Sequence, residues 1–176
     1  EASFNLADQM RREKEAAPLK AMGDALVAIG GRKTIDQLHK FRDDELSPRA
    51  FEWLQAIAGR NPVDRRLAVE EMGEFALAKD GAVAGKAVDH LVSLGNEGAH
   101  GLLKALKTPS TEIRLKIIPA LAATKNPRVA ANLSTFLIIG DIEGTVRCRN
   151  AAREAILSLG DAAVPYLFAG LRNPGT

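Results

Sequence analysis

Few side chains in this 176-residue sequence have the chemistry of a catalytic or metal-binding residue. The three histidines are His39, His90 and His100, and they form no HxxxH or HExxH pattern and no cluster with cysteine. His90 and His100 fall on facing helices of one predicted hairpin, but a partly exposed helix histidine is the commoner arrangement. The sequence therefore predicts no metal site and no cofactor.

Other reactive residue types are also interpreted as structural. Cys148 is the only cysteine, so no intramolecular disulfide can form. It is in register with apolar residues such as Ala152, which predicts a small core side chain rather than a nucleophile. Glu70, Glu71 and Glu74 place three carboxylates on one predicted helix without a suitably spaced histidine, which favours a solvated helix face. We therefore expect no catalytic residue and no enzymatic activity.

The elements that position these side chains are predicted to be helices. Apolar residues recur at helical spacing, and aromatic residues make up only 5% of the sequence. A cap residue followed by proline marks two helix starts, at Ser47-Pro48 and Asn61-Pro62. Thr34 and Ser110 are further predicted N-caps, and Val63 is predicted to face the core.

An internal repeat organises the sequence. Residues Lys86–Pro109 align without a gap to Ala151–Pro174, 65 positions later, and seven of the 24 pairs are identical. The identical pairs include Leu94/Leu159, Gly95/Gly160 and Leu102/Leu167. Each copy reads as an apolar helix, a Leu-Gly stop and a second apolar helix, with Leu94 and Leu159 expected in the core. Two units of about 32 residues account for the offset, which predicts stacked helical hairpins.

The stretch Asp161–Pro174, preceded by Val146-Arg147 and Ala151-Ala152, resembles the short bacterial HEAT repeats, including the HEAT-like repeats of phycobilin lyases. The resemblance covers about residues 60–176, whereas residues 1–59 match only as generic helical hairpins. It implies an all-α fold, a right-handed α-solenoid of antiparallel helix pairs, with the first 59 residues capping a continuous stack. It also implies that Arg114 and Arg147 are structural and pair with acids of neighbouring repeats.

The predicted function is a non-enzymatic scaffold that binds a protein or peptide on its concave surface. The favoured surface is the second helix of each pair with its flanking loops, at residues 97–107, 145–153 and 139–144. The candidate binding residues are Trp53, His100, Lys104, Lys107, Ile142, Arg149 and Arg153. Trp53 lies off the apolar axis of its helix, so it either covers the core from the side or belongs to a binding surface.

The charge distribution leaves a second function open. Residues 1–103 hold 14 basic and 17 acidic side chains, whereas residues 104–176 hold 10 and 5. The basic half could bind nucleic-acid phosphates, or it could be an unevenly decorated solvated surface. The resemblance also allows a subunit of a lyase-like enzyme, which would need a chromophore and a partner chain.

The sequence also bears on the compartment. No apolar run reaches the roughly 18–20 residues of a membrane span. A single cysteine suits a reducing compartment, so a cytoplasmic location is favoured, while a periplasmic or secreted location after signal removal stays open. Because the chain begins at Glu1, we expect a processed chain or a part of a longer bacterial repeat protein.

Overall fold

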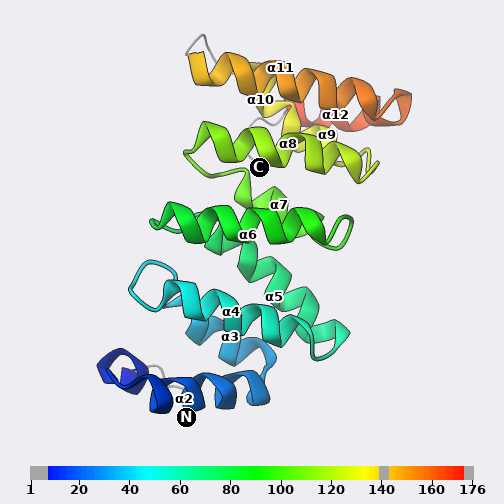
Figure 1. The fold of residues 1–176 in the computed structure, drawn as a ribbon. Coiled ribbons are helices and arrows are strands. Elements are labelled where there is room, and N and C mark those ends of the chain that lie inside the picture. Colours follow the sequence, from blue (N-terminus) through cyan, green and yellow to red (C-terminus); the bar gives the residue numbers. More distant parts are fainter. Residues whose placement is uncertain (1–7, 139–142, 173–176) are drawn as a thin grey trace. The chain divides into compact units, whose positions relative to one another are not determined.

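The computed structural model describes residues 8–138 and 143–172, and every regular element in those ranges is a helix (Figure 1). The chain divides into two compact units, an N-terminal unit of residues 1–89 and a C-terminal unit of residues 90–176. The division falls within α6 (Gly81–Ser93). It differs from the sequence-based division at residue 59, which separates the irregular from the repeated part of the sequence.

The N-terminal unit contains two complete helical hairpins. Its helices are α2 (Ala16–Ile29), α3 (Gly31–His39), α4 (Ser47–Ala58) and α5 (Pro62–Phe75). α2 packs against α4, and α3 packs against α5, so first helices contact first helices and second helices contact second helices. The core between them is built from buried apolar side chains such as Leu26, Leu54 and Phe75.

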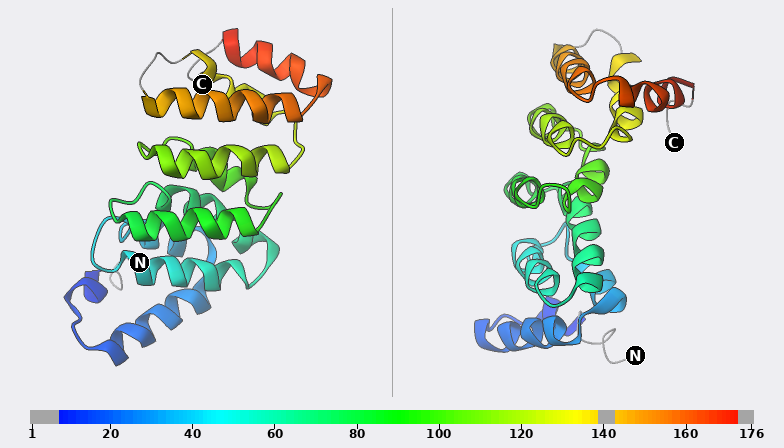
Figure 2. Two further views of the ribbon diagram at one scale, coloured as in Figure 1. Left: turned by 45° about the horizontal axis from the view of Figure 1, so that its top comes forward. Right: turned by 90° about the vertical axis from the view of Figure 1, so that its right-hand side faces the viewer.

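The C-terminal unit repeats this arrangement. Its elements are α7 (Ala99–Ala105), α8 (Thr111–Ala123), α9 (Val129–Leu133), α10 (Thr135–Ile138), α11 (Glu143–Ser158), the short 3₁₀ turn η1 (Asp161–Ala163) and α12 (Val164–Arg172). α8 packs against α11, and α9 packs against α12, while α7 also contacts α8 (Figure 2). Two layers of helices therefore enclose the core of this unit.

The repeat period extends over the described chain. The first helices of successive hairpins, α2, α4, α6, α8 and α11, begin 31, 34, 30 and 32 residues apart. Side-chain hydrogen bonds between consecutive hairpins follow the same period, because Arg60 to the Val27 carbonyl and Lys125 to the Ser158 carbonyl both span 33 residues. The period predicted from Lys86 onward thus also runs through the first 59 residues, where the sequence showed only generic hairpins.

Two of the predicted helix caps are confirmed. The side chain of Asn61 accepts a hydrogen bond from the backbone N–H of Asp64 at 2.9 Å. The hydroxyl of Ser110 accepts one from the backbone N–H of Ile113 at 3.3 Å. Each bond satisfies an N–H group that has no partner within its own helix.

The other two predicted caps are wrong. α3 already begins at Gly31, so Thr34 lies inside the helix, where its buried hydroxyl has no hydrogen-bond partner within residues 8–138 and 143–172. Pro48 does occupy the first turn of α4 as predicted, but the hydroxyl of Ser47 donates to the carbonyl of Arg42 at 2.6 Å instead of capping the helix. For Thr34 the helix begins three residues earlier than the pattern predicts, and for Ser47 the hydroxyl bonds to a preceding carbonyl instead.

The predicted inward position of Val63 is also wrong, since 69% of this residue is exposed. Its neighbour Asp64 is buried instead. The carboxylate of Asp64 accepts hydrogen bonds from the backbone N–H of Gly31 at 3.0 Å and from the side chain of Asn61 at 2.8 Å. These bonds turn Asp64 inward, and the adjacent Val63 consequently faces solvent.

Candidate functional site

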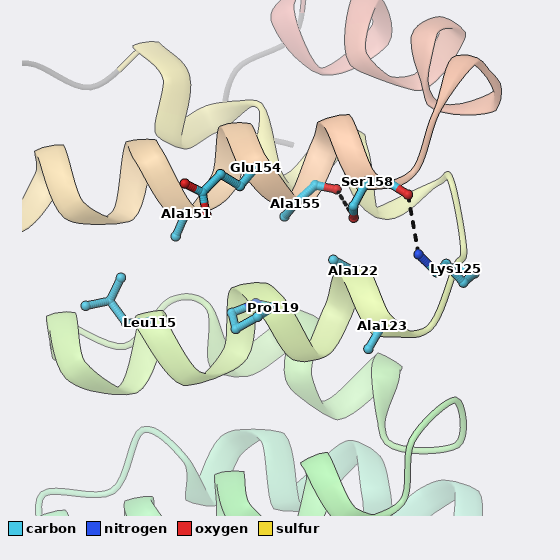
Figure 3. Close-up of a pocket in the computed structure, with 9 residues that line it drawn as sticks. All are labelled: Leu115, Pro119, Ala122, Ala123, Lys125, Ala151, Glu154, Ala155 and Ser158. Atoms are coloured by element: carbon cyan, nitrogen blue, oxygen red, sulfur yellow. Dashed lines mark hydrogen bonds between the residues drawn. The ribbon is translucent and has the colours of Figure 1, made fainter.

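A groove lies between α8 and α11 in the C-terminal unit, and Figure 3 shows the side chains that line it. Its volume is about 400 Å³. One wall consists of residues of α8 and of Lys125, which follows it: Leu115, Pro119, Ala122, Ala123 and Lys125. The other wall consists of residues of α11: Ala151, Glu154, Ala155 and Ser158. Both helices are first helices of consecutive hairpins, so the groove is a direct product of the repeat stacking.

Small side chains on the two facing surfaces create the groove. Ala151 and Ala155 are four residues apart on α11, which places them on one face of the helix. Ala122 faces Ala155 from α8, and Ala151 lies across from the segment between Leu115 and Pro119 (Figure 3). Interiors are normally filled by interdigitating side chains, and three methyl groups in facing positions leave space unfilled. The result is a partly open apolar groove along one side of a closely packed helix pair.

One end of the groove is closed by a contact between the two helix ends. Lys125 follows α8 with a φ of 55°, a left-handed conformation that is uncommon outside glycine. Its Nζ donates a hydrogen bond to the carbonyl of Ser158, the last residue of α11, at 3.4 Å. The hydroxyl of Ser158 donates to the carbonyl of Ala155 at 2.7 Å.

Two polar groups could recognise a ligand in the groove. Pro119 lies inside α8 and has no N–H group, so the carbonyl of Leu115 lacks the helical donor that any other residue would supply. Both residues line the groove, near the end opposite Lys125 (Figure 3). The carboxylate of Glu154 belongs to the wall formed by α11, where the residue is exposed. An apolar groove with a few polar groups is typical of a binding site.

The arginines near the start of α8 and α11 make contacts with neighbouring helices. Arg147 donates to the carboxylate of Glu112 at 2.8 Å, across one repeat, as the resemblance implies. The guanidinium of Arg114 lies 5.8 Å from the centroid of the Phe136 ring, a cation–π contact. Its buried Nε has no hydrogen-bond partner among the described residues. Arg114 and Arg147, two basic side chains of the C-terminal unit, are thus engaged within the fold.

Of the predicted binding residues that the structure describes, none lines the groove. His100, Lys107 and Arg153 are exposed, whereas Lys104 and Arg149 are partly buried. Ile142 lies outside the described residues. The predicted surface overlaps the groove only through Ala151, within residues 145–153, because the groove is formed by first helices and not by second helices. The feature of the sequence that could have predicted the groove is the series of alanines along these two helices.

Trp53 lies in the core of the N-terminal unit, which is the first of its two predicted alternatives. Only 8% of the residue is exposed. The indole ring of Trp53 packs on Gly23 of α2 so closely that a Cβ at Gly23 would overlap it. A glycine is therefore required where α2 meets α4, and Trp53 offers little surface to a partner.

The remaining reactive groups have structural surroundings. Cys148 is buried as predicted, and its burial raises the pKa of the thiol, with Arg114 and Arg147 acting in the opposite direction. Burial also lowers the pKa of His90. In the described ranges no group of three His, Cys, Asp or Glu side chains is arranged to hold a metal ion.

The described elements define an all-helical protein built from repeated hairpins. No family model matches the chain, and no curated protein matches its sequence. Of the helices described, none is by itself long and apolar enough to cross a membrane; only α11 and α12 counted together, with a bend of 111° between them, meet the criterion of length and composition.

Proposed function

We propose that the chain is a HEAT-like α-solenoid scaffold that binds a protein or peptide partner and catalyses no reaction itself. The groove between α8 and α11 supports this proposal most directly. Its volume of about 400 Å³ falls in the range of pockets that hold small ligands or peptide side chains. Its walls are mostly apolar and belong to two helices packed against each other, so the site is held by rigid elements.

The groove suits one mode of binding. An apolar side chain of the partner packs against Leu115 and Ala151, which line the groove and are partly exposed, and an adjacent basic side chain pairs with Glu154. A backbone or side-chain N–H of the partner donates to the carbonyl of Leu115. This combination of apolar anchor and flanking polar contacts is common to peptides that bind as helices or strands in a groove.

Selection from a phage-displayed random peptide library tests the proposal. Synthetic versions of the enriched peptides are titrated by fluorescence anisotropy against the unmodified chain and two variants. Ala151→Leu fills the groove and is expected to weaken binding at least ~10-fold, equivalent to about 1.4 kcal/mol. Ala169→Leu makes the same change at an exposed position of α12 outside the groove, and binding should stay within ~2-fold, as for surface changes in general.

Two outcomes would contradict the proposed site. If the selection enriches no peptides, the proposal that the chain binds peptides is rejected. If the unmodified chain and Ala151→Leu bind the peptides with equal affinity, the binding site lies on another surface. Mixed-sequence duplex DNA and single-stranded RNA are titrated in parallel at low ionic strength. Tight binding that falls steeply with salt would favour the nucleic-acid alternative instead.

A further inference from the structure

The groove between α8 and α11 carries groups of opposite charge toward its two ends (Figure 3). The ammonium group of Lys125 lies at one end. It donates a hydrogen bond to the Ser158 carbonyl at 3.4 Å, and because a lysine ammonium has three donors, the others stay available. Lys125 is exposed, so a bound molecule can reach these donors.

The other end of the groove carries acceptors. The Cα–Cβ bonds of a helix tilt toward its N-terminus, and the Glu154 side chain accordingly extends over Ala151, away from Ser158 (Figure 3). Its exposed carboxylate makes no hydrogen bond or ion pair with the part of the chain that the structure describes. The Leu115 carbonyl, whose helical donor is missing because of Pro119, lies at the same end. A ligand that brings a cation here supplies the missing partner.

The distance between the two ends corresponds to two turns of a helix. Ala151 and Ser158 are seven positions apart on α11, which is about 10 Å along the helix axis. The wall between them is apolar, and Ala151 and Pro119 keep accessible surface there. A bound molecule can therefore place a cationic, an apolar and an anionic group along this distance.

A helical peptide fits this arrangement better than an extended one. An extended peptide binds largely through its backbone, for which it needs a row of unpaired N–H and C=O groups. The walls of the groove are helices, whose interior backbone groups are paired with each other, so apart from the Leu115 carbonyl they offer an extended chain little to bind. A helix satisfies its own backbone groups and binds through side chains three, four and seven positions apart.

We propose that the groove binds an amphipathic helix with a basic residue, an apolar residue three or four positions from it, and an acidic residue seven positions from the basic one. The basic side chain pairs with Glu154, the apolar side chain packs on Ala151 and Pro119, and the acidic side chain accepts a hydrogen bond from Lys125. This inference rests on the proposed function, because it names the class of partner for the same groove.

Fluorescence anisotropy with a synthetic helical peptide tests the arrangement on the full chain. The labelled peptide carries lysine, leucine four positions later and glutamate three positions after that, in an alanine-rich helix. It is expected to bind at least ~10-fold more tightly than a scrambled peptide of the same composition, in which the three residues lie on different faces of the helix. Replacing a central alanine by proline breaks the peptide helix and should weaken binding at least ~10-fold.

Double-mutant cycles identify which side chains pair. Glu154→Gln is combined with a peptide whose lysine is replaced by glutamine, and Lys125→Gln with a peptide whose glutamate is replaced by glutamine. The two changes of each matched pair should be non-additive by ~3- to 5-fold in Kd, as for exposed ion pairs, and crossed pairs should be additive within ~2-fold. Glu52→Gln and Lys33→Gln make the same changes at exposed positions outside the groove and should leave Kd unchanged. Circular dichroism confirms that each variant remains helical.

Several results would overturn this inference and leave peptide binding in the groove intact, provided that selected peptides bind and lose affinity for Ala151→Leu. The patterned peptide could bind no better than the scrambled one. The peptide with proline could bind as well as the helical one, which would indicate an extended partner. The matched pairs could be as additive as the crossed pairs, which would mean that Glu154 and Lys125 do not contact the charges of the peptide. If the selection also enriches no peptides, the proposed function fails as well.

Discussion

Charged side chains in this protein connect one helical hairpin to the next. Asp43 shows this at the scale of a single residue. Its carboxylate accepts a hydrogen bond from Arg42 at 2.6 Å and one from the backbone N–H of Lys79 at 2.9 Å. The hydrogen bond from Arg42 is the main reason that the pKa of Asp43 is lowered. The next residue, Asp44, accepts a hydrogen bond from Arg11 at 3.2 Å, so two successive acids after α3 pair with arginines.

Asp43→Asn should lower stability in a pH-dependent way. Because the pKa of Asp43 is lower in the folded chain than its ordinary value of 3.8, its ionised form stabilises the fold above that pH. We expect a loss of about 0.5–1 kcal/mol at neutral pH, as for a partly exposed ion pair, and a shrinking difference as pH falls below 3.8. Urea unfolding of both proteins at several pH values measures this difference.

Glu45→Gln is the control for this prediction, since Glu45 is an exposed acid in the same loop. Its effect should be smaller than that of Asp43→Asn at neutral pH. A difference between Asp43→Asn and the unmodified chain that grows on acidification would contradict the assigned direction of the pKa shift.

At the scale of elements, the turn after α8 contains the one non-glycine residue with a positive φ among the described residues. Lys125 adopts a φ of 55°, which costs an L residue about 1 kcal/mol relative to glycine. The hydrogen bond from its side chain to the Ser158 carbonyl offsets part of this destabilisation. The connection therefore combines backbone strain with a contact between consecutive hairpins.

Comparing Lys125→Gly with Lys125→Ala separates these two effects. Both variants lose the side-chain hydrogen bond, but only glycine relieves the backbone strain. We expect the glycine variant to be more stable than the alanine variant by about 1 kcal/mol. Chemical denaturation of the two variants measures the difference directly, and equal midpoints would show that the turn has changed its conformation.

The prediction that Leu94 and Leu159 lie in the core is corrected by the structure of the helix ends. Leu94 and Leu159, which end the first helices of the two copies, are partly exposed rather than fully buried. Each precedes a glycine with a positive φ, at Gly95 and Gly160, where the chain turns away from the helix. Leu91 and Leu102 are the fully buried leucines of the first copy, and truncating them should cost more.

At the scale of the whole molecule, each unit has its own core, and this predicts where a destabilising change is felt. Leu102→Ala removes a fully buried side chain of the C-terminal unit and should cost ~2–5 kcal/mol there. Hydrogen exchange should accelerate across residues 90–176 and stay unchanged across residues 1–89, because local stability follows local contacts.

Leu54→Ala is the reciprocal variant, since Leu54 is fully buried in the N-terminal unit. Its effect on exchange should be confined to residues 1–89. Equal acceleration in both units for either variant would mean that the chain unfolds as one cooperative block.

The sequence by itself determined the helices, the period of about 32 residues, and the caps at Asn61 and Ser110. These features depend on local backbone chemistry and on apolar spacing along one helix, and both can be read from a short stretch of residues. It also assigned Cys148 to the core, because register within one helix was enough.

Only the tertiary structure decided the positions that depend on a neighbour one repeat away. Asp64 is buried because the backbone N–H of Gly31 donates a hydrogen bond to its carboxylate. Trp53 is buried because Gly23 leaves room for its indole ring. The groove exists because alanines of α8 and α11 face each other. Burial depends on which element packs alongside, and residues about 33 positions apart carry no local signal of their contact.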